Sequence, residues 1–192
     1  MPLSDKIAYL GYMKIKIFIA FFLSFFICFS ALAETKAEFN KLRNDYVAAL
    51  KNHDLAEEVY EKFKMVENPS AKILAYKGAL EAIMTRTTWN FFKKLDYLRK
   101  SEQSFKESVS KAPNSIEVRF MRMAVQYDIP RYLGFSNDLN ADKEFIIANI
   151  HNFNPVGLDD YTLNQIILFV KRCSQFSDNQ VDRFEDILAL NK

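Results

Sequence analysis

The chain has 192 residues, of which 49% are hydrophobic and 15% aromatic, with only four glycines and five prolines. This hydrophobic content supports a packed core and argues against a disordered chain, and the scarcity of turn-forming residues disfavours a many-stranded β protein. The formal charge of +2 comes from the segment 1–33, since the segment 34–192 holds equal numbers of basic and acidic residues. A balanced charge without a basic stripe argues against nucleic acid as a partner.

A secretory signal peptide is predicted between residues 13 and 33. Lys14 and Lys16 form its positively charged start, and they precede an apolar run at 17–29. The tripeptide Ala31-Leu32-Ala33 has the small-x-small pattern of a signal-peptidase site. A membrane span needs about 20 apolar residues, so a retained N-terminal anchor is the alternative that this run supports less well.

The signal peptide divides the chain into three parts. Residues 1–12 precede its charged start, and we interpret them as an upstream extension, with Met13 as the true start. Residues 34–192 then form a single domain that is exported to the periplasm or secreted. Only Cys173 remains in that domain, so we expect no internal disulfide, and its place on the apolar face of a predicted helix indicates a buried, inert thiol.

Periodic apolar residues and short polar breaks predict eight helices in this domain. They begin near residues 35, 54, 71, 89, 115, 137, 159 and 177. Gly78 lies in the middle of the third helix, where it costs about 1 kcal/mol relative to Ala, and the usual compensation is the close approach of a neighbouring helix. The aromatic run Trp89-Asn90-Phe91-Phe92 at the start of the fourth helix is interpreted as core packing, with a binding cluster as the alternative.

Prolines mark a repeat of helix pairs. Pro69, Pro113 and Pro155 recur at i, i+44 and i+86, and each stands before the first helix of a pair. This nearly even spacing predicts an all-α domain of four antiparallel helical hairpins that stack as an α-solenoid, a right-handed superhelix. A plain bundle of unrelated helices is the alternative.

Two segments resemble the tetratricopeptide repeat (TPR). Phe105, Ser108 and Pro113 match the aromatic, small and proline positions of that family's second helix and following turn, and residues 76–79 look like its first-helix positions. The resemblance covers about residues 71–174 and implies a TPR-like solenoid. The family's signature tryptophan and Leu-Gly pair are absent, and the spacing of the prolines exceeds the usual repeat of about 34 residues.

The order of motifs in the domain is similar to that of small exported helical proteins of Bacteroidota. A small-residue helix, AYKGALEAI at 75–83, is followed by a long helix that ends in a proline. Next come the Ile-Glu-Val-Arg-Phe-x-Arg helix at 116–122, the Ile-Pro-x-x-Leu-Gly turn at 129–134 and the Asp-Lys helix at 142–143. Those proteins have no assigned activity, so the resemblance implies an exported helical protein and no reaction.

The fifth helix carries the least generic chemistry in the sequence. Arg119, Arg122 and Gln126 are spaced i, i+3, i+7 and so form one polar face on an otherwise apolar helix. In one interpretation this face, with Tyr76, lines a groove and clamps a partner's carboxylate, which suits the planar guanidinium group. In the favoured interpretation the arginines pair internally and hold two hairpins in register. The candidate carboxylates are those of Asp128, Asp138 and Asp142.

The sequence predicts no catalytic, cofactor or metal site. His53 and His151 are the only histidines, and no metal-ligand spacing, phosphate loop or nucleophile elbow is present. A solenoid offers a groove for helices or extended peptides, so we expect a non-enzymatic interaction or adaptor protein of the cell envelope with a protein or peptide partner. The alternative is a small-ligand carrier with a cavity between hairpins, lined by Tyr76, Phe120 and Arg119.

Overall fold

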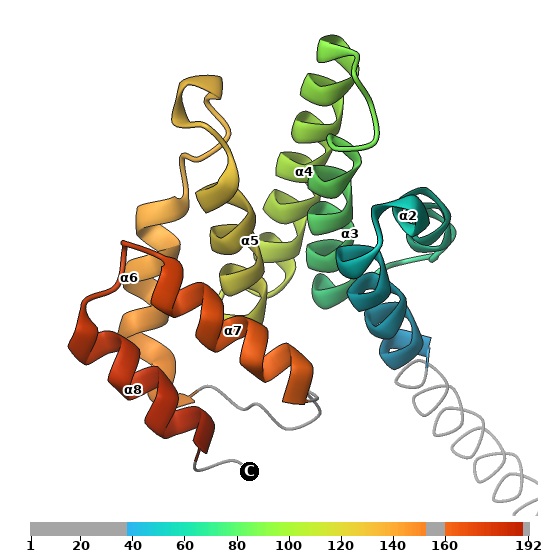
Figure 1. Cartoon of the computed structure of the whole chain (residues 1–192). Helices are drawn as coiled ribbons and strands as arrows, with labels where there is room; N and C mark the ends of the chain where they lie inside the picture. Colours follow the sequence, from blue (N-terminus) through green and yellow to red (C-terminus); the bar gives the residue numbers. More distant parts are fainter. Residues whose placement is uncertain (1–37, 153–159, 190–192) are drawn as a thin grey trace, which may run out of the picture. The chain divides into compact units, whose positions relative to one another are not determined.

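The computed structural model describes residues 38–152 and 160–189, and every regular element in these residues is a helix (Figure 1). The chain divides into two compact units, Met1–Lys41 and Leu42–Lys192. The signal peptide and the start at Met13 that the sequence predicts lie outside the described residues. The elements below belong to the second unit, and they confirm the all-α class.

The second unit begins with helical residues 42–51 and continues through α-helices and short 3-10 helices (η). Helix α2 packs on α3, α3 packs on both α4 and α5, α5 packs on α6, and α7 packs on α8. The stacking of these helices as a solenoid stays a prediction. In chain order the elements are η1 (His53–Leu55), α2 (Ala56–Lys64), α3 (Ala71–Met84), α4 (Phe91–Lys111), α5 (Ile116–Asp128), η2 (Arg131–Leu133), α6 (Leu139–Asn149), η3 (Ile150–Asn152), α7 (Asp160–Arg172) and α8 (Asp178–Ala189).

Short polar side chains set the starts of several helices. Ser70, Asn90 and Ser115 are the N-cap residues of α3, α4 and α5, and each side-chain oxygen accepts a hydrogen bond from the backbone N–H three residues later, at 3.1–3.3 Å. Before α8, the backbone N–H of Ser177 donates to the side chain of Gln180 at 3.0 Å, which is one arm of a capping box. These contacts are local in sequence, which is why the helix starts can be predicted from it.

Helix α3 is held to α4 by side chains of α4 that bind its main chain. The hydroxyl groups of Ser101 and Ser108 donate to the carbonyl oxygens of Gly78 and Ala71, at 2.7 and 2.6 Å. Between these two bonds the ring of Phe105 lies on Gly78, where a Cβ atom would come within 3.1 Å of two ring carbons. The close helix approach predicted from Gly78 is therefore confirmed.

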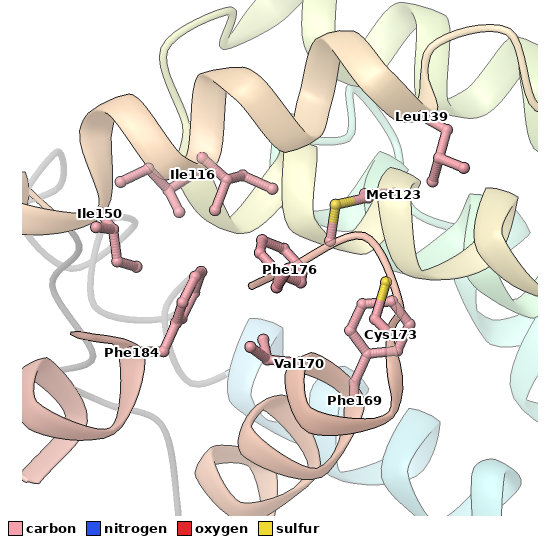
Figure 2. Packing of buried hydrophobic residues seen from close by; sticks show 10 residues of the cluster. Ile116, Met123, Leu139, Ile150, Phe169, Val170, Cys173, Phe176 and Phe184 are labelled. Atoms are coloured by element: carbon pink, nitrogen blue, oxygen red, sulfur yellow. The ribbon is translucent and has the colours of Figure 1, made fainter. Parts of the chain in front are cut away.

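A cluster of buried apolar side chains forms a core that joins α5, α6, α7 and α8 (Figure 2). Two ring pairs within it meet edge to face, with centroids 5.4 Å apart for Phe120 and Phe169 and 5.3 Å apart for Phe176 and Phe184. Cys173 belongs to this core and is 2% exposed, which confirms its predicted burial. The buried members are Ile116, Met123, Leu139, Ile146, Ile150, Phe169, Val170, Cys173, Phe176 and Phe184.

The aromatic run at the start of α4 does not pack in the core, so that prediction was wrong. Trp89 is fully exposed, and Phe91 and Phe92 are 58% and 79% exposed. Helix α4 begins at Phe91 with Asn90 as its N-cap, so Trp89 belongs to the connection that precedes the helix.

The reason is that α4 extends past the end of its neighbour. The Ser108–Ala71 hydrogen bond marks a point where the two helices are level. From that point α4 extends back to Phe91 and α3 extends onward to Met84, in the same direction in space. The α4 segment is longer by about one helical turn. At 1.5 Å per residue, the first turn of α4 therefore overhangs α3 by about 6 Å. Figure 1 shows the α3–α4 pair ending freely on that side, and the exposed fractions of Phe91 and Phe92 agree with an overhanging first turn.

Candidate binding site

The polar face predicted on α5 points at α6. Arg122 is 7% exposed and donates from Nε and Nη2 to the two oxygens of Asp142, at 2.6 and 2.7 Å. Arg119 donates from Nη1 to Oδ1 of the same carboxylate at 2.9 Å. Gln126 exchanges two hydrogen bonds with Asp138, one to its carboxylate at 3.2 Å and one from its backbone N–H at 3.1 Å. All three predicted residues of this face thus have internal partners.

These contacts form an internal clamp between α5 and α6. Asp142 is fully buried, and its carboxylate accepts bonds from two arginines. Burial lowers the pKa of Arg122, but the hydrogen bonds and the charge of Asp142 outweigh that effect, and the pKa lies above its usual value. The clamp joins the consecutive helices α5 and α6, which the proline spacing assigns to one predicted hairpin, whereas the arginines were predicted to hold two hairpins in register. A role of the arginines in holding a partner's carboxylate stays a prediction.

Tyr76, the fourth candidate residue, contacts a different part of α5. Its hydroxyl donates to Oε1 of Glu117 at 3.3 Å, and Lys72 forms an ion pair with the other oxygen of that carboxylate. Tyr76 is 3% exposed, and its burial, together with the charge of Glu117, raises its pKa above the usual value. Its ring meets that of Tyr46 edge to face, with centroids 5.0 Å apart. The four candidate residues therefore divide between two places.

Tyr76 lines an apolar cavity of about 360 Å³. Helical residues 42–51 and helices α3, α5, α7 and α8 all contribute to its wall, so segments far apart in the sequence enclose it. The wall predicted for a small-ligand carrier is right for Tyr76 and Phe120 and wrong for Arg119, which does not line it. The aromatic and large apolar residues of the wall include Tyr46, Tyr76, Phe120, Ile166, Phe169 and Phe184.

The cavity opens to solvent beside two leucines that sequence reasoning missed. Leu50 is 38% exposed and Leu168 is 58% exposed, and both line the cavity. Besides the two tyrosines, the polar side chains of the lining are those of Glu117, Gln165 and Arg172. An apolar wall with a few polar groups is typical of binding sites. The signal for Leu168 was its place in an unbroken apolar run at 166–170, which is more than one buried face of a helix needs.

A second buried polar cluster ties α2, α3 and α4 together. Glu81 is 2% exposed and accepts hydrogen bonds from the hydroxyl groups of Tyr60 and Ser104, at 3.2 and 2.7 Å. Burial raises the pKa of Glu81, although the bond from Ser104 acts in the opposite direction. Burial and the charge of Glu81 likewise raise the pKa of Tyr60. The sequence signal was a single carboxylate within the apolar segment of α3.

Among residues 38–152 and 160–189, no group of three or more His, Cys, Asp and Glu side chains is placed to hold a metal ion. Within the same ranges, no helix combines the length and the hydropathy that a membrane crossing requires. No family model, curated protein or solved structure matches the chain.

Proposed function

We propose that this chain is a non-enzymatic interaction module of the cell envelope that seats an apolar side chain of a partner protein in the cavity beside Tyr76 and Phe120. The observation that carries the proposal is the open apolar cavity of about 360 Å³. The signal-peptide pattern at residues 13–33 supports export to the envelope.

The rim of the cavity favours a protein partner. In protein interfaces a few apolar or aromatic side chains fill pockets and contribute most of the binding energy, and the surrounding contacts exclude water. Leu50 and Leu168 stand at the mouth with large exposed fractions, so a partner seated over the cavity buries both. Gln165 and Arg172 are exposed beside them and supply the polar rim that such interfaces have.

The clamp between α5 and α6 supports this site without touching the partner. Arg122 and Asp142 fix α5 against α6, and the opposite part of α5 presents Phe120 and Ala124 to the cavity. In this proposal the candidate residues have different roles. Tyr76 belongs to the binding wall, whereas Arg119, Arg122 and Gln126 hold the helix that carries the wall.

The test places a photo-crosslinking amino acid at Leu168 in the native cell envelope. A partner seated in the cavity is captured there, and the substitution Ala124→Phe abolishes the capture because it fills the cavity from α5. Ala148→Phe is the matched control, since Ala148 is exposed on α6 and does not line the cavity. Both variants must retain the circular dichroism spectrum and the melting temperature of the unchanged protein. The same captured proteins in both variants would count against the proposal.

A small apolar ligand is the second candidate, and the size of the cavity favours it. Pockets for small molecules span about 300–1,000 Å³ and are mostly apolar, a range that includes this cavity. Native mass spectrometry of the protein from its own source distinguishes the two. A bound small molecule that is lost in Ala124→Phe indicates a carrier, and an empty cavity with a Leu168 crosslink to a protein indicates the interaction module.

A further inference from the structure

The end of the α3–α4 connection and the first turn of α4 carry an exposed aromatic cluster, which we call the aromatic tip: Trp89, Phe91 and Phe92. Their exposed fractions are 100%, 58% and 79%. The two phenylalanine rings meet edge to face with centroids 6.0 Å apart, and both project from the first turn of α4. Three large exposed aromatic side chains within four residues form a local apolar cluster, unlike the single exposed apolar residues that are ordinary on soluble proteins.

Local hydrogen bonds give the tip a defined conformation. The hydroxyl groups of Thr85 and Thr87 donate to the carbonyl oxygens of Ala82 and Met84, at 2.7 and 3.0 Å. On the other side of the tip, the side chain of Asn90 accepts from the backbone N–H of Lys93 at 3.1 Å and starts α4. These bonds order the backbone on both sides of Trp89, at the end of α3 and at the start of α4.

Cations outnumber carboxylates in the sequence on either side of the tip. Residues 85–95 contain Arg86, Lys93 and Lys94 and no Asp or Glu. The domain as a whole has equal numbers of acidic and basic residues, so this excess of positive charge in a short segment is a local feature.

A second connection at the same end of the helices also exposes an aromatic side chain next to a cation. Figure 1 shows the α3–α4 and α5–α6 connections at the top of the view. The topology agrees, since α4 runs back along α3 and α5 then turns to run beside α3 in the same direction. In the α5–α6 connection Tyr132 is 87% exposed, next to the exposed Arg131.

We propose that this end of the protein docks on the surface of an anionic lipid bilayer, with the aromatic tip inserted at the headgroup level. Trp and Tyr favour that level because their rings are apolar and their edges are polar, and Phe adds buried apolar area. Lys and Arg place their alkyl chains along the apolar surface and their charges at the lipid phosphates. Positive charge beside the tip complements anionic headgroups, which favours this occupant over a neutral protein surface.

The chain contains its own probe for the test, since Trp89 is its only tryptophan. Its emission reports the polarity around the tip alone, even when the apolar segment at residues 17–29 tethers the full chain to a bilayer. With the full chain, we expect the emission to shift to shorter wavelength on vesicles of phosphatidylglycerol and phosphatidylcholine. We expect brominated lipid to quench it. On pure phosphatidylcholine vesicles the shift is smaller, and high salt reverses it on the anionic vesicles, because salt screens the attraction between exposed charges.

Variants separate the apolar part of the docking from the electrostatic part. Phe91→Ser with Phe92→Ser removes apolar area, keeps the probe and abolishes the shift. Lys93→Gln with Lys94→Gln weakens it, with about a fivefold higher lipid concentration needed at half-shift for each cation removed. Met65→Ser is the matched control, because Met65 is 77% exposed after α2, near the start of α3 and away from the tip, and this variant leaves the shift unchanged.

Two results would overturn the proposal. One is an emission spectrum of Trp89 that stays the same on anionic vesicles, or that shifts equally with and without Phe91 and Phe92. The other is a shift that depends on protein concentration without lipid, since it would make a second copy of the chain the occupant of the tip.

Discussion

Asp142→Ala is predicted to destabilise the protein more than any other single loss in the clamp. The substitution removes a carboxylate that is fully buried and binds two arginines. Arg122 then keeps its charge at 7% exposure with only the contact to Asp138, at 3.2 Å, to compensate it. An arginine does not lose its proton in such a place, so the cost appears as a loss of folding free energy.

The structure sets the size of this loss. Removing one partner of a buried ion pair costs about 3–5 kcal/mol, because the other charge is left without compensation. Total stabilities of domains are about 5–15 kcal/mol, so Asp142→Ala removes a large part of the whole. The matched control is Asp138→Ala, whose side chain is 43% exposed, and exposed ion pairs contribute about 0–1 kcal/mol.

Urea denaturation followed by circular dichroism measures both losses. The combination of Asp142→Leu with Arg122→Met should recover most of the stability that Asp142→Ala removes, because apolar residues of similar size replace a buried pair at little cost. A loss below about 1 kcal/mol for Asp142→Ala, no larger than that for Asp138→Ala, would refute the reasoning. It would mean that solvent reaches the clamp, and the arginines would again be available to a partner.

Three further predictions concern the remaining buried groups. Gly78→Ala should lower the melting temperature, because the new Cβ atom would lie 3.1 Å from the buried ring of Phe105. In a Phe105→Leu background the ring is gone, so the same substitution should stabilise the protein by up to about 1 kcal/mol through helix propensity. Because the pKa of Glu81 is raised in the folded state, that state holds its proton more tightly than the unfolded state. The free energy of unfolding, measured by urea titration, should therefore fall as pH rises from the ordinary Glu pKa to the raised one, by at most about 1.4 kcal/mol per pH unit. If Glu81→Gln shows the same dependence of stability on pH, Glu81 is not its cause. Cys173 is 2% exposed and burial raises its pKa, so a thiol reagent should label it only in denaturant. Rapid labelling of the folded protein would show instead that the core around Cys173 opens.

Features that depend on neighbouring residues could be predicted from the sequence. Helix α3 was expected to begin near residue 71, and it begins at Ala71 because Ser70 caps it after Pro69. The role of Gly78 was also predictable, since a glycine inside a helix has a known cost and few ways to offset it. In both cases the physical cause lies within a few residues of its effect.

Features that depend on how helices dock could not be predicted. The spacing of Arg119 and Arg122 placed them on one face, but three carboxylates were equally acceptable partners. Only the docking of α6 on α5 selects Asp142 as the buried one. The exposure of Trp89 could not be predicted for a similar reason, because it follows from the different lengths of α3 and α4. The cavity is furthest from prediction, since its wall comes from helices at opposite ends of the domain's sequence.

The way α4 holds α3 also determines which positions can change over evolutionary time. Ser101, Ser108 and Lys111 donate to carbonyl oxygens of Gly78, Ala71 and Pro69, at 2.6–2.9 Å. A carbonyl oxygen is the same whatever side chain its residue bears, so these bonds do not constrain the sequence of the segment that accepts them. Mutational drift in α3 is therefore limited by volume, by the close approach at Gly78 and by the buried Glu81, which accepts a hydrogen bond from Ser104 of α4. Elsewhere along the pair, the alignment of the two helices is inherited through Ser101, Ser108 and Lys111 of α4.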